Sequence, residues 1–335
     1  MGQYRHSPAV VGKLLDLAAQ GKTGVDAAAV LGLAPKTATT YIKKAKEMGR
    51  DAFMKEVTVN YCGFSEEAPV ARSEQSYEAY NEKNIAPDPD MFGRLILKEC
   101  PDSVLIIPDL QFPFAHKDCL NFLAMVAQRY KPDMVIGIGD EVDNNFLSAY
   151  EKDPDLMGAS QEYIMAQEQM SQLFKLFPRA YGLHSNHGKK RISGAWKRAG
   201  IPSCLAPKYA DFLAAPRGWA WYEEVRLDNI LFHHGDGEKA INSSYLLKHI
   251  PAEYGRHFNV VHGHRHEQCG RKANETVGDV DYWGAYTGCL IDPYSKAFGY
   301  TKGRKAKLGC GVIVHGEYKQ IRMVLDNDGR WIGTI

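Results

Sequence analysis

Paired cysteines, long apolar runs and a large excess of one charge are all missing from this sequence of 335 residues. The seven cysteines are odd in number and scattered, and no two are spaced as Cys-x-x-Cys. This pattern argues against a disulfide framework and against a thiolate zinc site. The apolar runs are only a few residues long, and no basic segment followed by an apolar one opens the chain. We therefore expect no membrane span and no secretory signal, and we predict a cytoplasmic protein.

The net charge of +1 hides three unlike segments. Residues 1–50 carry eight Lys and Arg against three Asp and Glu, residues 51–100 carry five against ten, and residues 101–335 carry 28 against 27. Ten of the twelve histidines lie between His184 and His315, and histidine is a common metal ligand and acid–base group. We predict a basic domain over residues 1–50, an acidic linker over 51–95 and a domain that carries the chemistry over 96–335.

The basic segment has the pattern of three short helices. Ser7 and Pro8 are typical of a helix start, Thr23 and Asp26 form a weak capping box before a second helix, and a third helix is predicted over residues 35–48. This order resembles a helix-turn-helix module, whose last helix enters the major groove of DNA. Its predicted DNA contacts are the outward-facing side chains of the third helix, Lys36, Thr39, Thr40, Lys43 and Lys44. The alternative is a helical unit for oligomerisation, but the excess of positive charge favours DNA.

From residue 104 onward, short apolar runs alternate with helical stretches. Strands are predicted within residues 104–108, 134–139, 180–184, 230–233 and 259–262, with helices over 116–130 and 160–177. This alternation is typical of an α/β sheet with crossover connections. Two later segments, around residues 281–290 and 312–325, have the glycine punctuation and alternation of antiparallel strands.

Side chains that can bind metal follow each of the five predicted strands. In chain order they are Asp109, then Asp140 and Asp143, then Asn186 and His187, then His234, then His264 and His266. Because strand ends at one edge of a sheet lie close together, we expect these residues to form one pocket. Oxygen and nitrogen ligands without sulfur suit Mn²⁺, Fe, Zn²⁺ or Mg²⁺. One carboxylate can bridge two such ions, which can then hold a hydroxide for in-line attack on phosphorus.

The order of these motifs resembles the calcineurin-like metallophosphoesterase family. The family's Gly-Asp-x-x-Asp is present at residues 139–143, its Asn-His pair at 186–187 and its Gly-His-x-His at 263–266. The resemblance spans residues 104–266 and implies an α+β fold, a β-sandwich flanked by helices. It implies that Asp109 and His266 bind a first metal ion, that Asp140 bridges, and that a second ion is bound by Asn186, His234 and His264. It also implies that His187 protonates the leaving oxygen and that Asp143 orients His187.

Two positions depart from the family pattern. Gln111 stands where the family usually has histidine, so we expect its amide oxygen to bind the first metal more weakly or to shift the ion preference towards Mn²⁺ or Mg²⁺. Gly188 stands where an acidic residue is usual, and we expect it to leave room for a bulky substrate. An inactive relative is the alternative, although the other ligand positions are intact. For His184, His233 and His262 we favour a packing role over hydrogen bonds to the metal ligands.

A basic stretch follows the Asn-His pair. It contains Lys189, Lys190, Arg191 and Trp196, and a second basic group lies at residues 302–307. Such residues suit a polyanion whose bases stack on aromatic rings, whereas a solvated helix face is the alternative. We predict a phosphoesterase with two divalent ions, Mn²⁺ being favoured, that acts on nucleic acid as a DNA nuclease or DNA-end phosphatase. The helical module would tether it to DNA, and such modules often work as homodimers. The alternatives are a hydrolase of small nucleotides or phosphoproteins with a regulatory helical module, and a DNA-binding scaffold with a vestigial site.

Overall fold

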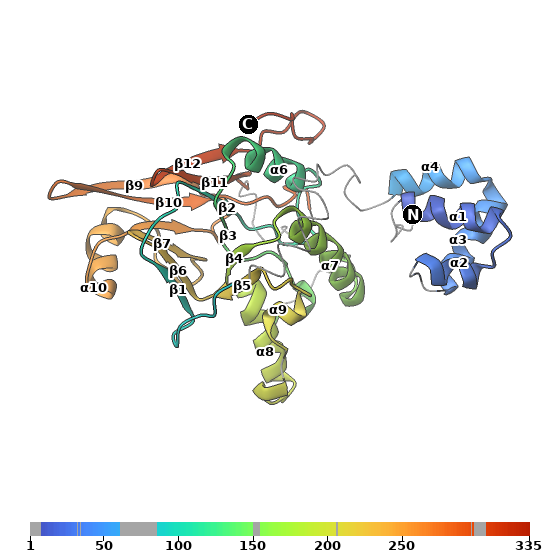
Figure 1. The fold of residues 1–335 in the computed structure, drawn as a ribbon, viewed down its shortest axis with the longest axis horizontal. Helices are drawn as coiled ribbons and strands as arrows, with labels where there is room; N and C mark the ends of the chain where they lie inside the picture. The colour runs from blue at the N-terminus through green and yellow to red at the C-terminus, as the bar shows by residue number, and fades with distance from the viewer. Residues whose placement is uncertain are drawn as a thin grey trace. The chain divides into compact units, whose positions relative to one another are not determined.

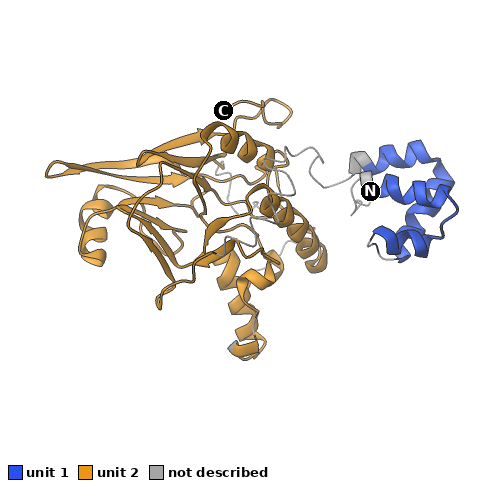
Figure 2. Cartoon of the chain, viewed as in Figure 1, with its two compact units in different colours: residues 1–66 blue, residues 67–335 orange. Residues whose placement is uncertain are grey.

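The protein has a mixed α/β fold in a computed structural model, which describes residues 8–31, 33, 35–60, 86–149, 155–205, 207–295, 297 and 306–335 (Figure 1). The chain divides into two compact units, residues 1–66 and 67–335 (Figure 2). Within the described ranges, no helix has both the length and the apolar character needed to cross a bilayer. The predicted helix start at Ser7, much of the predicted linker and the basic residues at 302–305 lie outside the described residues.

The first unit consists of four helices among its described residues. They are α1 (Pro8–Ala19), α2 (Gly24–Leu31), α3 (Pro35–Met48) and α4 (Arg50–Asn60). The predicted cap is present, because the Asp26 amide donates to Thr23 Oγ1 at 3.2 Å and the Thr23 hydroxyl donates to Asp26 Oδ2 at 2.6 Å. Apolar side chains of the four helices form one core, which includes the fully buried Leu14 of α1 and Ala38 of α3.

Helix α4 corrects the predicted domain boundary at residue 50. Phe53 and Val57 are fully buried in the core of the first unit, and the Phe53 ring lies 6.0 Å from that of Tyr41. Residues 51–60 are therefore the last helix of the basic unit and not the start of a linker. The acidic composition of the segment obscured the i, i+4 spacing of two apolar residues, which is the signal of a packed helix. At the other end, Leu95 lies in a strand of the second unit, so the predicted linker also ends too late.

The second unit contains two mixed six-stranded sheets. One has the order β1-β6-β7-β8-β10-β9 and the other has the order β12-β11-β2-β3-β4-β5. The strands of the first sheet are β1 (Arg94–Leu97), β6 (Glu224–Leu227), β7 (Ile230–His233), β8 (Asn259–His262), β10 (Val280–Thr287) and β9 (Cys269–Val277). Those of the second are β12 (Glu317–Arg322), β11 (Gly309–Val314), β2 (Ser103–Ile107), β3 (Met134–Gly137), β4 (Ala180–Leu183) and β5 (Trp219–Tyr222).

The α/β class is confirmed, and the strands that carry the five motifs are divided between two sheets. Three of the motif strands, β2, β3 and β4, belong to one sheet, and β7 and β8 belong to the other. Four-residue strands that are buried on both faces show no alternation, so the sequence pattern could not assign a strand to a sheet. For the same reason β5 and β6, which are buried over most of their length, were not predicted.

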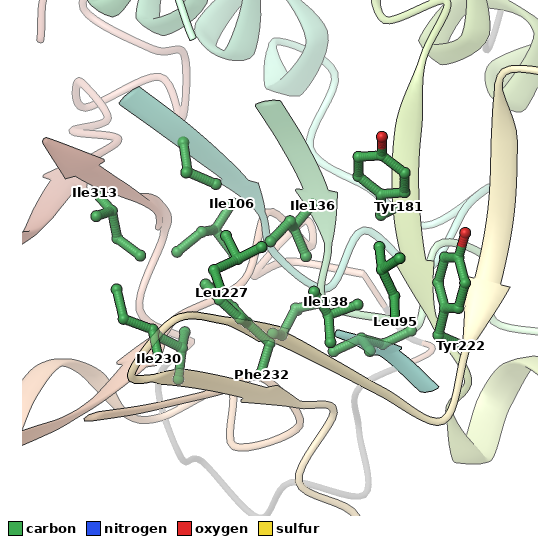
Figure 3. Packing of buried hydrophobic residues seen from close by; sticks show 14 of the residues in the cluster. Leu95, Ile106, Ile136, Ile138, Tyr181, Tyr222, Leu227, Ile230, Phe232 and Ile313 are labelled. Atoms are coloured by element: carbon green, nitrogen blue, oxygen red, sulfur yellow. The ribbon is translucent and has the colours of Figure 1, made fainter. Parts of the chain in front are cut away.

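The two sheets pack face to face through apolar side chains (Figure 3). Ile106 of β2 and Ile136 of β3 meet Leu227 of β6 and Phe232 of β7, and all four are fully buried. Successive side chains of a strand point to opposite faces, so the equally buried Leu105 lies on the outer face of its sheet.

Helices account for the remaining burial. The outer face of β2 is in contact with α6 (Cys119–Tyr130), and α7 (Ala159–Leu176) packs beside α6. The shorter helices are α8 (Arg191–Arg198), α9 (Tyr209–Phe212) and α10 (Ile250–Tyr254), with short turns η1 (Asn145–Leu147), η2 (Asn186–Lys190), η3 (Ser203–Leu205) and η4 (Tyr245–His249). Figure 1 shows β9 and β10 as a long hairpin that extends from the sheets.

Candidate metal centre

The carboxyl ends of five strands meet at one edge of the two sheets. Strands β2, β3 and β4 run parallel, and so do β7 and β8, in which His233 pairs with His262. Parallel strands place their carboxyl ends on the same side, so the residues that follow them converge. His234 joins the two sheets directly, because its Nδ1–H donates to the Ile138 carbonyl at 2.9 Å.

The first group of candidate ligands consists of Asp109, Asp140 and His266. One ligand atom of each lies within 4.8 Å of the others. Asp109 is fully buried, and its Oδ2 is 3.0 Å from His266 Nε2 and accepts the His264 amide at 2.9 Å. In the described part of the chain, Asp109 Oδ1 and Gln111 Oε1 are buried oxygens with no hydrogen-bond donor. Because a buried oxygen without a donor is costly, both atoms fit the ligands of a hard cation.

Asp140 belongs to both ligand groups. Its Oδ2 is 3.3 Å from His234 Nε2 and 3.4 Å from Gln111 Nε2, and its Oδ1 accepts the His187 amide at 3.1 Å. Burial raises the pKa of this carboxyl, but His234 and His187 outweigh burial and hold the pKa well below its usual range. The side chain is therefore a fully buried carboxylate that faces both halves of the site.

The second group of candidate ligands is Asp140, His234 and His264. Asn186 adds its side-chain oxygen, which lies 2.9 Å from His234 Nε2. Burial lowers the pKa of His234, yet the Asp140 carboxylate more than offsets this and raises it to about 10. The same negative groups would stabilise a metal cation beside them. The His234 Nδ1 bond to Ile138 fixes the ring so that Nε2 faces the ligand group, as metal-binding histidines require.

His187 and Asp143 form a close pair beside the ligands. His187 Nδ1 is 2.8 Å from Asp143 Oδ1, and His187 Nε2 is 4.0 Å from Asp140 Oδ2. Burial lowers the pKa of His187, but the two carboxylates prevail and raise it. The contact agrees with the predicted orientation of His187 by Asp143, and it leaves Nε2 on the side of the candidate ligands.

Two glycines of the motifs are required by close approach. A Cβ on Gly139, whose φ is +103°, would lie 2.7 Å from His234 Nδ1. A Cβ on Gly263 would lie 2.5 Å from Asp109 Oδ1. Any side chain at these positions would displace a candidate ligand. The sequence pattern therefore places glycine where backbone and ligand nearly touch.

Gly188 does not leave room for a substrate, which corrects that expectation. A Cβ there would lie 2.6 Å from the Tyr209 hydroxyl and 3.0 Å from Ser185 Oγ. The Tyr209 hydroxyl in turn donates to Glu141 Oε2 at 3.0 Å, and Trp221 Nε1 donates to Glu141 Oε1 at 2.9 Å. The space beside the Asn-His pair is thus filled by a buried tyrosine from a distant helix, which the sequence could not indicate.

Glu141 is a buried acid that the sequence reasoning missed. It is 1% exposed and follows Asp140 directly, and burial raises its pKa to about 7. Glu162 is similar, since it is 1% exposed, has a pKa raised to about 7 by burial and accepts the Asn145 amide at 2.5 Å. Neither had a signal in sequence, because a glutamate in a helix or turn is ordinarily exposed.

The three other histidines have mixed surroundings. His233 Nε2 is 2.9 Å from Glu224 Oε2, and its ring stacks on His262 at 6.0 Å between centroids. His262 Nε2 is 3.3 Å from the Tyr245 hydroxyl. His184 is in contact with the Tyr209 ring, and burial lowers its pKa to about 4. Among the described residues, the hydrogen bonds and ring contacts of these three histidines do not reach a candidate metal ligand, which agrees with a packing role.

The basic residues after the Asn-His pair have acidic partners. Lys189 Nζ lies 2.6 Å from Glu223, Lys190 pairs with Asp236, and Arg191 contacts Asp143. Trp196 is partly buried, and its indole nitrogen is covered and has no acceptor among the described residues. This stretch is therefore less available to a polyanion than its sequence suggested.

The predicted DNA-contacting residues of α3 are all exposed. The hydroxyls of Thr39 and Thr40 donate to carbonyls one turn earlier, those of Pro35 and Lys36. Lys43 is 3.7 Å from Glu47, and Lys44 is 3.8 Å from Glu56 of α4. No ion pair of Lys36 is found in the described part of the chain, so Lys36 is the residue of this set with the least local compensation.

No protein-family model matches the sequence, and no curated protein matches it.

Proposed function

We propose that this protein is a metal-dependent phosphoesterase of the calcineurin-like family and that its substrate is nucleic acid. The observation that carries the proposal is the shared position of Asp140 in two ligand groups, one with Asp109 and His266 and one with His234 and His264. Two-metal phosphoesterases need a common ligand to keep their ions about 3.5–4 Å apart. The donor-free oxygens of Asp109 and Gln111 support the same conclusion, as do two sheets packed face to face.

The residues fit two divalent ions of the harder kind. Asp109, Gln111 and His266 would hold the first ion, Asn186, His234 and His264 the second, and Asp140 both. Such ions supply a hydroxide at neutral pH and stabilise charge on the phosphoryl oxygens. A site with three oxygen-donating side chains besides Asp140 and no sulfur favours Mn²⁺ over Zn²⁺.

His187 would act as the general acid. Asp143 Oδ1 accepts a hydrogen bond from His187 Nδ1–H at 2.8 Å, which leaves Nε2 on the side of Asp140. Asp140 and Asp143 raise the pKa of His187, which favours the protonated ring whose Nε2 can donate to the oxygen that leaves phosphorus. With 8% of its surface exposed, the ring is close enough to solvent to be reprotonated after each turnover.

The choice of nucleic acid rests mainly on the first unit. Its three predicted helices are present and display Lys36, Thr39 and Thr40 on the exposed side of α3. Phosphate contacts from such a helix would hold DNA near the active unit and raise its local concentration. A second candidate, hydrolysis of small phosphoesters, is favoured by the pairing of Lys189, Lys190 and Arg191 with acids.

The test is a hydrolysis assay of the full chain with 5′- and 3′-labelled oligonucleotides, a nucleotide and p-nitrophenyl phosphate, with and without Mn²⁺. We expect Mn²⁺-dependent shortening or end dephosphorylation of the oligonucleotides, and its loss in His187→Ala. His315→Ala is the matched control, because the His315 side chain is 75% exposed. Hydrolysis of the small esters alone would support the second candidate. DNA binding without any hydrolysis in Mn²⁺ would identify a scaffold and contradict the proposal.

A further inference from the structure

Arg191 lies at the start of α8, four residues after His187, and faces inward. Its side chain is only 19% exposed, against 48% for Lys189 and 60% for Lys190. Arg191 Nη1 donates to the Asp143 carbonyl at 2.5 Å and lies 3.5 Å from Asp143 Oδ2. We propose that Arg191 is a positioning residue that holds Asp143 against His187, and not one of the nucleic-acid contacts predicted from sequence. This inference rests on the proposed function, in which His187 is the general acid.

The Asp143 carboxylate is held on both sides. Oδ1 is bound to His187 Nδ1 at 2.8 Å, and Oδ2 faces the Arg191 guanidinium. Asp143 is 5% exposed, so water has little access to replace a lost partner. The same nitrogen, Arg191 Nη1, contacts both the carbonyl and the carboxylate of Asp143, so it restrains the direction of the carboxylate as well as balancing its charge.

Further hydrogen bonds tie the loop after β3 to the segment after β4 and to α7. Asn144 Nδ2 donates to the His187 carbonyl at 2.9 Å. The Glu162 carboxylate accepts the amides of Asn145 at 2.5 Å and Phe146 at 3.2 Å. Among these residues Asp143 and Glu162 are two buried carboxylates close to each other, and the Arg191 charge favours ionisation of Glu162. Arg191 is therefore the cation of a small buried network around the general acid.

The geometry also explains why three consecutive basic residues differ in role. Lys189 and Lys190 end the turn η2, and Arg191 is the first residue of α8. The two lysines face outward and pair with Glu223 and Asp236, whereas Arg191 faces the buried Asp143. A substrate phosphate could compete for the two exposed lysines. It would have to displace Asp143 to reach Arg191.

The consequence is a specific effect on proton donation. A leaving oxygen that is strongly basic needs a proton from His187, whereas a p-nitrophenolate leaving group does not. If Arg191 positions Asp143, its loss harms only the first kind of substrate. If Arg191 bound phosphate, its loss would harm both substrates and would raise KM.

The experiment compares Arg191→Gln, Arg191→Lys and the control Lys175→Gln, at an exposed position of α7, on an alkyl or nucleoside phosphoester and on its p-nitrophenyl counterpart. We expect Arg191→Gln to lower kcat for the unactivated ester by about 10- to 100-fold and for the p-nitrophenyl ester by no more than about threefold. Arg191→Lys keeps the positive charge but lacks the guanidinium group. Its loss of kcat should therefore be smaller than that of Arg191→Gln and equally selective for the unactivated ester. Lys175→Gln should keep kcat for both esters. An equal loss on both esters, or a rise in KM alone, would overturn the inference.

A second readout needs no activity. Imidazole ¹⁵N spectra of the metal-free full-length protein, at a pH at which the ring is neutral, report which nitrogen of His187 carries the proton. In the wild type and in Lys175→Gln we expect one tautomer, with the proton on Nδ1, and in Arg191→Gln a mixture of the two. An unchanged tautomer in Arg191→Gln would refute the positioning role. If the wild type hydrolyses no ester with any divalent ion, the proposed function fails, and these spectra alone decide whether Arg191 positions Asp143.

Discussion

Asp140 Oδ2 lies 3.3 Å from His234 Nε2, although the two residues follow strands of different sheets. Asp140 follows β3 of one sheet, and His234 follows β7 of the other. Their contact therefore joins the two sheets at the carboxyl ends of these strands. Asp140 is fully buried and His234 is 3% exposed, so neither side chain has room to move. Their contact therefore fixes the distance between the two ligand groups. The metal centre that we propose depends on this contact.

Asp140→Asn should remove metal from both halves of the site at once. The amide keeps the shape of the side chain but lacks the charge that both ligand groups share, so we expect loss of both ions and of hydrolysis. Metal content after dialysis against Mn²⁺, measured by mass spectrometry, checks this. Asp211→Asn, the same change at an exposed position, is the control. Retention of two ions by Asp140→Asn would contradict the bridging role.

Gln111→His should tighten the first ligand group selectively. Gln111 Oε1 is a buried oxygen without a donor, and an imidazole nitrogen at this position would prefer Zn²⁺ or Fe to Mn²⁺. We expect calorimetric titration to show that one of the two metal sites binds Zn²⁺ more tightly than in the wild type, with the affinity of the other site unchanged. If the Zn²⁺ affinity of both sites rises equally, Gln111 does not belong to the first ligand group alone.

Gly188→Ala should destabilise the protein without opening the site. The added methyl group would lie 2.6 Å from the Tyr209 hydroxyl, which is held by Glu141. Overpacking of this kind lowers the free energy of unfolding by about 1–3 kcal/mol. Chemical denaturation measures the change. Tyr209→Phe removes the clashing oxygen, so the double variant with Gly188→Ala should recover part of the lost stability. If the effects of the two single changes simply add, the contact is not the cause.

Phe53→Ala should unfold the basic unit. Phe53 is fully buried against Tyr41, and truncation of a buried phenylalanine costs about 3–5 kcal/mol. We expect a lower thermal midpoint for the transition of this unit and a loss of DNA binding at the temperature where it is unfolded. Val25→Ala, at a position that is 59% exposed, is the control. A Phe53→Ala protein as stable as the wild type would restore the linker interpretation of residues 51–60.

Glu162 should make the stability of the second unit depend on pH between about 4.5 and 7. Burial raises the pKa of this carboxyl to about 7, so the folded state holds the proton more tightly than the unfolded state. A carboxyl with a raised pKa therefore costs stability as pH rises from about 4.5 to 7, and the cost is constant above that range. We compare the free energies of unfolding of Glu162→Gln and the wild type at pH 5 and at pH 8. The difference should shift in favour of the variant at pH 8, by up to about 3 kcal/mol. A pH-independent difference would show that the carboxyl has an ordinary pKa.

The sequence by itself predicted the five residues that form the two groups of Asp and His side chains in the described part of the chain. The residues that follow β2, β3, β4, β7 and β8 were predicted from apolar runs that end in a polar side chain, and Asp109, Asp140, His234, His264 and His266 do lie together. That prediction works because the direction of a strand and the residue after it are local properties. The three helices of the basic segment and the cap at Thr23 were equally local.

Only the tertiary structure decided how these local pieces combine. It divided the motif strands between two sheets, placed α4 in the core of the basic unit and filled the space beside Gly188 with Tyr209. It also gave Lys189, Lys190 and Arg191 different partners from three distant segments. The physical reason is that burial and ion pairing depend on residues far apart in the chain. Composition and periodicity report what a residue can do, and the packing around it determines which of those possibilities is used.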